Sequence, residues 1–263
     1  MFKPLPLFIA ARYLRAKRKN RFAALVSAVS VAGIGLGVAV LLIVLSVMNG
    51  FEREVAARIL GMTADATVFA APETLRDWRS LAARLETDPE VRAARPFIRG
   101  SGMLNARGKV RGILIYGVPP DGESDVSQLE HYLQGVSLTA LDAPAREPAV
   151  ILGQTLADEL GVGTGEDVTL ISPQWDQEQQ LGLPNYDRLH MVGSFKAGMH
   201  EFDSSFGIMS VDAAARLFKL EGTVSGLRLK LKDSARAPLV AARLGAALGP
   251  SYVVLDWTRY HRN

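Results

Sequence analysis

Residues 22–48 read FAALVSAVSVAGIGLGVAVLLIVLSVM and contain no Asp, Glu, Lys or Arg. At a rise of about 1.5 Å per residue, a helix of this length crosses a hydrocarbon layer of about 30 Å. A cleavable signal peptide has a shorter apolar region and a small-x-small cleavage site, and residues 47–51 (VMNGF) form a poor site. The stretch therefore predicts one uncleaved transmembrane helix.

The residues before this helix indicate its orientation. Seven basic residues precede it, and no acidic residue occurs before Glu52. Such a flank keeps the N-terminus in the cytoplasm and sends the following residues across the membrane. Within residues 1–21, Leu7, Phe8, Ala11 and Leu14 recur at helical spacing, which is typical of an amphipathic helix on a membrane surface. A solvated basic tail is the alternative.

Charge and cysteine content narrow the function classes. The formal net charge is +3, but seven of the 30 Lys+Arg precede the membrane segment, so the remainder is mildly acidic. This balance disfavours nucleic acid as a partner, whereas the basic start fits anionic lipid headgroups. The absence of cysteine excludes disulfides, thiol nucleophiles and thiolate metal ligands.

Beyond the membrane segment, hydrophobic periodicity predicts an α+β domain. Residues 49–63 extend the helix, with Gly61 as its C-cap. Strands are expected at 67–69, 91–102, 103–105 with 110–117 as a hairpin, 149–152, 167–171, 188–194, 206–210, 225–232 and 252–255. Helices are expected from Pro72 to Glu86, at 154–160, from Asp212 as N-cap to 219, and at 237–248. The closing β-α-β echoes the first, which indicates one part built from both chain ends and one part inserted between them.

A search for reaction chemistry finds no catalytic constellation. The four histidines are scattered, and the densest polar cluster, residues 200–203 (HEFD), lacks metal-ligand spacing. The run Gly161-Val-Gly-Thr-Gly165 follows an expected helix and lacks the Gly-Lys-Ser/Thr ending of a phosphate loop, so it predicts a turn. We expect no catalytic residue, no metal site and no cofactor bound by this chain.

The middle of the membrane helix contains Gly33 and Gly37 in a small-x-x-x-small pattern. Such a pattern lets a second helix approach closely, and we expect these residues to form a helix-packing site. The alternative is that glycines are simply common in membrane helices.

Several runs of residues resemble one family, the lipoprotein-releasing ABC transporter permeases of the LolC/LolE type. The most specific run is Leu45–Glu54 (LSVMNGFERE), followed by 59–61 (ILG). Supporting runs are 8–15 (FIAARYLR), 33–37 (GIGLG), 192–195 (VGSF), 198–203 (GMHEFD), 211–218 (VDAAARLF) and 256–257 (DW). The resemblance covers essentially the whole chain.

The resemblance implies a domain organisation similar to that of the macrolide-exporter type. A split β-α-β "porter" part surrounds an inserted, mainly-β "sabre" part that carries a "hook" loop. The implied ranges are 1–21 cytoplasmic segment, 22–48 membrane helix, 49–63 helix extension, 64–118 and 223–257 porter-like part, 119–222 sabre-like part with hook 173–184, and 258–263 approaching a second membrane helix.

The resemblance also implies function and partners. Such permeases extract lipoproteins from the inner membrane and pass them to a periplasmic chaperone. Two permeases, identical or siblings, work with two copies of a cytoplasmic ATPase, which uses ATP and magnesium. The implied lipid- and lipoprotein-facing residues are Val40, Val44, Val47, Met48 and Phe51. The implied chaperone-docking hook residues are Pro173, Trp175, Leu181, Gly182, Pro184 and Arg188.

Other interpretations stay open at this point. A related permease of the same superfamily serves drug efflux or cell-division signalling. A chain with a single membrane helix also fits a membrane-tethered periplasmic sensor or binding module. A periplasmic hydrolase is the least supported class, because no nucleophile–base or metal-ligand pattern is present.

Overall fold

The computed structural model describes residues 21–62, 64–70, 74–143, 146–173 and 184–260. The chain divides into two compact units, 1–56 and 57–263, each of which is described by itself. The predicted amphipathic helix within residues 1–21 lies almost entirely outside the described residues.

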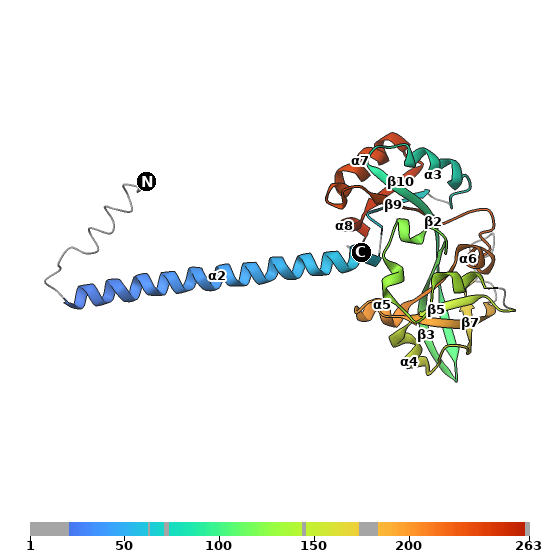
Figure 1. Ribbon diagram of the computed structural model, residues 1–263, viewed down its shortest axis with the longest axis horizontal. Coiled ribbons are helices and arrows are strands. Elements are labelled where there is room, and N and C mark those ends of the chain that lie inside the picture. Colours follow the sequence, from blue (N-terminus) through green and yellow to red (C-terminus); the bar gives the residue numbers. More distant parts are fainter. Residues whose placement is uncertain (1–20, 63, 71–73, 144–145, 174–183, 261–263) are drawn as a thin grey trace. The chain divides into compact units, whose positions relative to one another are not determined.

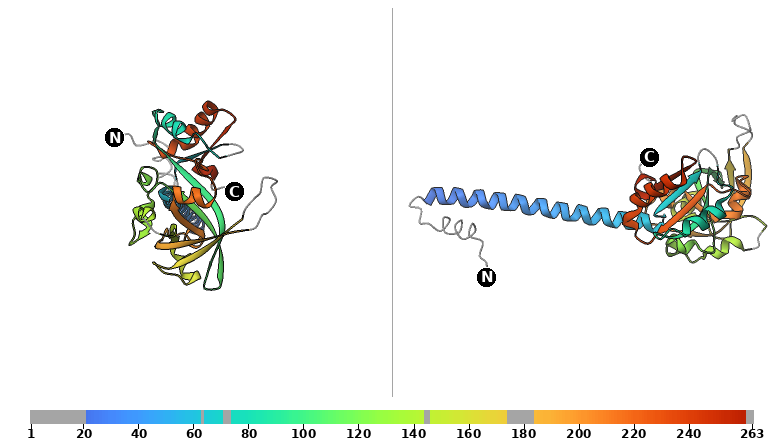
Figure 2. Two further views of the ribbon diagram at one scale, coloured as in Figure 1. Left: turned by 90° about the vertical axis from the view of Figure 1, so that its right-hand side faces the viewer. Right: turned by 90° about the horizontal axis from the view of Figure 1, so that it is seen from above.

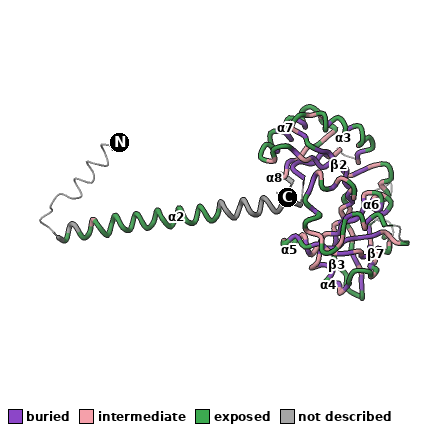
Figure 3. The backbone as a smooth tube through the Cα atoms, viewed as in Figure 1, coloured by how far each residue is buried: buried purple, intermediate pink, exposed green. Residues whose placement is uncertain are grey.

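The N-terminal unit is dominated by one long helix, α2 (Arg21–Met62). Its segment Leu25–Met48 has a mean hydropathy of 2.7, and none of it is buried, so by length and composition it is able to cross a membrane. Figure 3 shows this segment as exposed. The helix continues without a break through the predicted extension. Gly61 lies inside its last turn, so the prediction of Gly61 as C-cap is wrong.

The second unit begins with a four-stranded antiparallel sheet in the order β10-β1-β9-β2. Its strands are β1 (Ala66–Ala70), β9 (Gly226–Leu231), β10 (Tyr252–Asp256) and the first half of β2 (Val91–Ala106). Helix α3 (Trp78–Glu86) connects β1 to β2, and α7 (Ala237–Leu248) connects β9 to β10. Two β-α-β units interleaved in this order form a ferredoxin-like sheet. We call it the first sheet.

The second half of β2 enters a different set of strands, which closes on itself. Its neighbours are, in spatial order, β3 (Lys109–Val118), β8 (Phe206–Ser210), β5 (Ala149–Gly153), β7 (Asn185–Phe195) and β6 (Asp167–Ser172), and β6 pairs again with β2. We call this closed set the strand ring. Closure leaves few unpaired strand edges. Figures 1 and 2 show β2 running from the first sheet into the ring.

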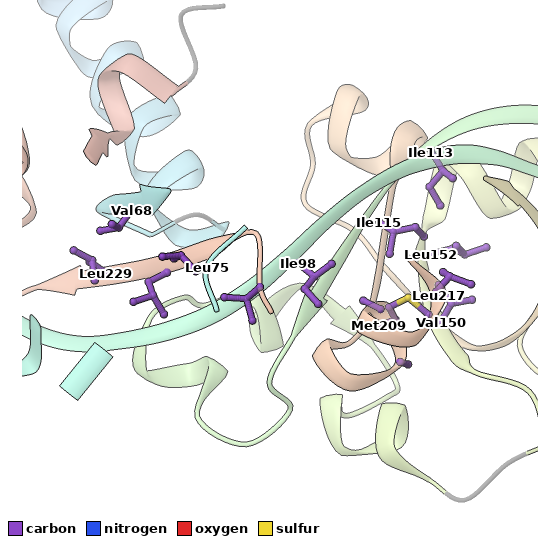
Figure 4. Close-up of a cluster of buried hydrophobic side chains, with 14 of the residues drawn as sticks. Val68, Leu75, Ile98, Ile113, Ile115, Val150, Leu152, Met209, Leu217 and Leu229 are labelled. Carbon is purple, nitrogen blue, oxygen red and sulfur yellow. The ribbon is translucent and has the colours of Figure 1, made fainter. Parts of the chain in front are cut away.

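Apolar side chains that alternate along the strands fill the interior of the ring. Leu104, Ile115, Leu152, Leu170 and Leu189 are all fully buried there. The same cluster continues into the first sheet, and Figure 4 shows labelled members on both sides of Ile98. Helices α4 (Gln154–Leu160) and α6 (Val211–Leu217) add to this cluster.

A second core lies on the outer face of the ring. Three short 3-10 helices cover it, η1 (Glu123–Asp125), η2 (Leu129–Tyr132) and η3 (Leu138–Asp142), with the short strand β4 (Leu133–Gln134) between the last two. Leu129, Leu138 and Leu141 from these segments bury Ile151 and Phe195 of the ring. The sequence analysis predicted none of the 3-10 helices, because each is too short to show a hydrophobic period.

Several predicted boundaries need correction. α3 begins at Trp78 rather than at Pro72, because the backbone of Leu75 instead pairs with Val224 (N–O 2.8 and 3.0 Å). The N-cap of α6 is Ser210, whose hydroxyl accepts the N–H of Ala213, and not Asp212. Residues 91–106 form one strand rather than two. Two short helices were not predicted, α5 (His200–Ser205) and α8 (Trp257–Tyr260).

The inserted part also begins earlier in the chain than expected. The prediction placed all of 64–118 with the first sheet. The pairing with β9 ends at Phe97, and from Ile98 onward β2 pairs with β3 of the ring. The change from one set of strands to the other therefore occurs inside β2.

Candidate functional site

The first group of predicted site residues lies on the apolar part of α2. Val40, Val44, Val47 and Met48 are 52%, 57%, 67% and 56% exposed, respectively. Their spacing of three and four residues places them on one side of the helix. The side chain of Phe51 lies outside the described residues. The other sides of this segment are equally apolar and exposed, as at Leu41, Leu42 and Ile43, so the whole surface needs lipid or another apolar partner to cover it. That lipoproteins face the side of Val40 and Val44 remains a prediction.

The two predicted helix-packing glycines leave the helix surface open. A Cβ atom built on Gly33 or Gly37 meets no atom within 4 Å. Both residues therefore offer a shallow surface that a second helix is able to approach closely. Pairing through these glycines remains a prediction.

The predicted hook loop connects β6 to β7. Ser172 at the end of β6 pairs with Asn185 at the start of β7, so the two ends of the loop are held side by side. Pro173 and Pro184, which bound the loop, are both exposed. Trp175, Leu181 and Gly182 lie outside the described residues.

A row of three residues with two exposed ends lies at the base of this loop, on the outer face of the ring. Met103 of β2 pairs with Ile171 of β6, and Ile171 pairs in turn with Tyr186 of β7. Met103 is 48% exposed and Tyr186 is 67% exposed. Residues directly opposite one another on antiparallel strands point to the same face. The sequence analysis did not single out this row, because the pairing of β2 with β6 joins distant parts of the chain.

Arg188, the remaining predicted hook residue, lies on the same face one row further along. It pairs with Thr169 of β6 and is exposed. In the next row, His190 Nδ1 lies 2.8 Å from Asp167 Oδ1. The outer face of β6 and β7 therefore changes from apolar beside the loop to polar and charged away from it.

The far end of the β2–β3 hairpin is held by charged contacts. Its two-residue turn, Arg107-Gly108, has positive φ angles of 51° and 77°, which are typical of a type I′ turn. Arg107 contacts Glu166 at 2.5 Å, and Arg111 contacts Glu159 at 2.7 Å. The backbone N–H of Gly163 and the nearby Arg107 lower the pKa of the Glu166 carboxyl.

The polar cluster at residues 200–203 has a structural role. Asp203 is 5% exposed, and its carboxylate accepts the backbone N–H groups of Ala197 (2.7 Å) and Gly198 (3.1 Å). This arrangement closes the turn between β7 and α5. Among the described residues, no three His, Asp or Glu side chains gather closely enough to hold a metal ion. Gly161 has a φ of 73° and ends α4, as a turn residue does.

Comparison with known proteins identifies the class. Residues 27–247 match the family described as "MacB-like periplasmic core domain", and the chain belongs to this family. It is also similar along its whole length to proteins named lipoprotein-releasing system transmembrane protein LolC. It is 36% identical to that of Xylella fastidiosa over all 263 residues and 35% identical to that of Neisseria meningitidis over 260 residues.

The chain is also similar to a protein named LolE. The chain is 30% identical over 233 residues to the lipoprotein-releasing system transmembrane protein LolE of Haemophilus influenzae, covering 87% of the chain and 55% of that protein. The chain spans 63% of the length of the Xylella LolC and 62% of the Neisseria one. Among solved structures, the periplasmic region of MacB from Actinobacillus actinomycetemcomitans superposes with a TM-score of 0.48 at 12% identity, covering 76% of this chain and 91% of that one.

Proposed function

We propose that the chain is the N-terminal part of a permease subunit in an ABC transporter that extracts lipoproteins from the bacterial inner membrane. The similarity to LolC and LolE proteins carries this proposal, because it includes both the apolar helix and the domain that follows it. In this function the chain holds no cofactor and catalyses no reaction. ATP hydrolysis with magnesium belongs to a separate cytoplasmic ATPase.

Two features of the described residues support this function. The exposed stripe from Val40 to Met48 offers an apolar wall for acyl chains, and a flexible Met adapts to variable chains. The row of Met103, Ile171 and Tyr186, in which Met103 and Tyr186 are exposed, adjoins the proline-bounded loop 173–184, as a docking surface for a soluble chaperone requires. The first sheet and the strand ring correspond in this proposal to the porter-like and sabre-like parts.

The remaining partners and the orientation complete the proposal. The basic residues before Phe22 place the N-terminus in the cytoplasm and residues after about 49 in the periplasm. A second permease, identical or a sibling, packs against Gly33 and Gly37. Membrane lipids surround the rest of the apolar helix.

Photocrosslinking in cells with the full-length protein tests the two sites separately. A crosslinking residue at Val44 is expected to trap lipoproteins, and one at Trp175 or Leu181 a small periplasmic chaperone. Leu42 is the matched control for Val44, because two helical residues correspond to about 200° and place it on the opposite side. Leu239, 70% exposed on α7, is the control for the loop.

The outcomes separate the alternatives. Lipoproteins at Val44 without a chaperone at the loop keep the transport function and assign docking to another subunit. If neither product forms, the lipoprotein function is contradicted, and the result favours the efflux, signalling or sensor alternatives. If Leu42 traps lipoproteins as well as Val44 does, the assignment of one lipoprotein-facing side of the helix fails.

A further inference from the structure

The side of β7 that faces β5 is paired over only part of its length. Pairing of β5 with β7 begins at Ala149 and His190 and runs toward Phe195 (Figure 1). Within the described part of the chain, the residues of β7 before His190 pair with β6 on the other side only. Next to the loop 173–184, one edge of β7 is therefore left without a neighbouring strand. We call this edge, at Tyr186 to Arg188, the open edge.

Hydrogen bonds further along β7 show which backbone groups point toward the open edge. The N–H of His190 donates to the carbonyl of Pro148, on the side of β5, at 2.9 Å. The N–H of the next residue, Met191, donates toward β6, also at 2.9 Å. Because successive residues of a strand direct their backbone groups to opposite sides, Tyr186 and Arg188 direct theirs toward the open edge. Among the described residues, none accepts from or donates to these two N–H and two C=O groups.

Pro148 explains why β5 does not continue along the open edge. If the parallel pairing extended by two more residues, the carbonyl of Arg188 would accept the N–H of residue 148, and proline has no N–H. The chain also bends at residues 146 and 147. The sequence itself therefore keeps a second strand of the ring from forming here, and two donors and two acceptors of the backbone stay available.

The chemistry of the open edge selects an extended polypeptide as its partner. Donors and acceptors that alternate at strand spacing match the backbone of an added strand. A folded partner would have to offer an unpaired strand edge of its own, which folded proteins avoid. An unfolded segment, in contrast, has all its backbone groups available. The open edge therefore favours an unfolded, extended segment over a folded protein.

The side chains beside the open edge specify the sequence of such a segment. Arg188 and Arg146 are both exposed, and neither forms an ion pair with another described residue. Tyr186, on the same face as Arg188, is 67% exposed. Side chains on adjacent strands interact directly, so an acidic residue is favoured opposite Arg188 and an apolar one opposite Tyr186.

We infer that the open edge binds an extended, unfolded peptide segment, which pairs with Tyr186 and Arg188 as an added strand and places an acidic side chain opposite Arg188. That this segment belongs to the transported lipoprotein rests on the proposed function. Pro184, at the end of the loop 173–184, directly precedes β7. The lipoprotein peptide and the chaperone are then held on neighbouring surfaces.

Hydrogen exchange resolved to single amides tests the open edge in the 263-residue chain in lipid nanodiscs. In the free protein we expect the amides of Tyr186 and Arg188 to exchange fast, and those of Asp187 and Leu189, which face β6, to exchange slowly. The probe is the peptide acetyl-Ser-Val-Thr-Glu-Thr-Val-Ser-amide, whose Val-x-Glu-x-Val pattern reads the same in both strand directions. At millimolar concentration it should slow exchange at Tyr186 and Arg188 about fivefold or more.

Two N-methylated versions of the probe test the backbone pairing on the unchanged protein. One is methylated at the amides of Val and Glu, and the other at the amides of the two Thr. Only one edge of an added strand faces β7, so one version should lose about fivefold or more in affinity and the other should keep it. Replacing Glu by Lys in the probe should also weaken binding, by about twofold to fivefold.

A charge reversal in the protein completes the test. Arg188→Glu should bind the Lys peptide more tightly than the Glu peptide, whereas Arg92→Glu, at an exposed position of β2, should keep the original preference. The inference is overturned if Tyr186 and Arg188 exchange as slowly as Leu189 in the free protein, if the probe does not slow them, or if both N-methylated peptides bind alike. It is also overturned if Arg188→Glu still prefers the Glu peptide. The comparison of the N-methylated peptides stays decisive even if Arg188→Glu folds poorly.

A crosslinking residue at Arg146, two residues before Pro148, separates this inference from the proposed function in the full-length protein. Lipoproteins trapped at both Val44 and Arg146 support the two together. If they are trapped at Val44 only and the probe does not pair, the open edge fails as a site and the transport function stands. If the probe pairs but position 146 traps the chaperone or nothing, the peptide site stands and the lipoprotein as its occupant fails. If the probe pairs and lipoproteins are trapped at neither position, the proposed function fails as well.

Discussion

Arg228 and Glu123 form a buried, bidentate ion pair that joins the first sheet to the inserted part of the chain. Arg228 Nη1 donates to Glu123 Oε1 at 2.8 Å, Nη2 donates to Oε2, and the hydroxyl of Ser127 donates to Oε1 at 2.6 Å. The two side chains are 8% and 1% exposed. Since β9 carries Arg228 and η1 begins at Glu123, the pair fixes these two segments against each other.

Removing one member of this pair should destabilise the domain strongly, because the other charge stays buried without a partner. We expect Glu123→Gln or Arg228→Met to lower the free energy of unfolding by about 3–5 kcal/mol, and the double variant to lose less than the sum. Thermal unfolding of the three variants measures this. Arg107→Ala, which breaks the exposed pair with Glu166, should lower the free energy of unfolding far less, because water screens the two charges. Equal losses in the buried and exposed pairs would contradict the prediction.

Asp88 should give the domain a specific sensitivity to acid. Arg243 donates to both of its carboxylate oxygens, at 2.6 and 2.9 Å, and this hydrogen bonding lowers the pKa of Asp88 below its ordinary value of 3.8. A carboxyl with a lowered folded-state pKa stabilises the fold above its unfolded value, and that contribution is lost as the pH falls through the folded value.

The corresponding experiment records the melting temperature between pH 6 and pH 2.5. Arg243→Ala should lower it near pH 6 and reduce the part of the acid dependence that appears below about pH 3.8. Because Arg243 is 47% exposed, its removal should lower the free energy of unfolding by less than about 1 kcal/mol. Arg84→Ala, at an exposed position of α3, is the matched control. If Arg243→Ala shows the same dependence of melting temperature on pH as the unchanged protein, the contact with Asp88 is not a source of the acid sensitivity.

Gly153 should tolerate no side chain, because α5 passes directly against it. A Cβ atom at this position would lie 2.3 Å from the backbone oxygen of Asp203. We expect Gly153→Ala to destabilise the domain by about 1–3 kcal/mol through the backbone shift it forces. In Gly163→Ala, where a Cβ meets nothing within 4 Å, the change should be small. Chemical unfolding of both variants measures the two free energies of unfolding. Similar values would contradict the close approach of α5 to Gly153.

Tyr186 should affect docking and not folding, if the row beside the hook loop meets the chaperone. Its side chain is 67% exposed, so Tyr186→Ala should change the unfolding free energy by less than about 0.5 kcal/mol. The same substitution should reduce chaperone crosslinking from position 175. Leu239→Ala, equally exposed on another surface, should leave the yield unchanged. A full yield in Tyr186→Ala would exclude the row from the docking surface.

Gly33 and Gly37 should control the pairing of the permease with its partner subunit. Replacing either by Leu fills the shallow surface and should lower the amount of paired permease recovered in mild detergent. Gly35→Leu provides the control, since it lies about 200° around the helix from both. In each case the Cβ enters open space within this chain, so the helix itself should be unaffected. Equal recovery from Gly33→Leu and Gly35→Leu would argue against the glycine contact.

Elements whose signals are local in the sequence were predicted well, whereas elements held by distant partners were not. The bounds of α7 and β8 were predicted to the residue, because their periodicity and end signals are local. The start of α3 was missed because a distant backbone partner, Val224, holds Leu75 outside the helix that Pro72 favoured. Closure of the ring through β2 and β6 was missed for the same kind of reason, since Met103 and Ile171 lie far apart in the chain.

The candidate site residues also differ in how far the sequence alone could predict them. The apolar segment of α2 was predictable from the sequence, because an uncharged run of that length is a local signal. The row of Met103, Ile171 and Tyr186 was not, because it exists only once three strands align. A cavity lined by Phe97, Tyr116 and Trp257 could not be predicted from the sequence either, because its lining residues come from separate elements.

The continuity of β2 has a mechanical consequence. Residues 91–97 of this strand are bonded to β9, and residues 103–105 of the same strand are bonded to β6, whose next residues lead into loop 173–184. We therefore expect a tilt of the first sheet to be passed along β2 to the strands at the base of the loop, because both sets of pairs belong to one continuous strand.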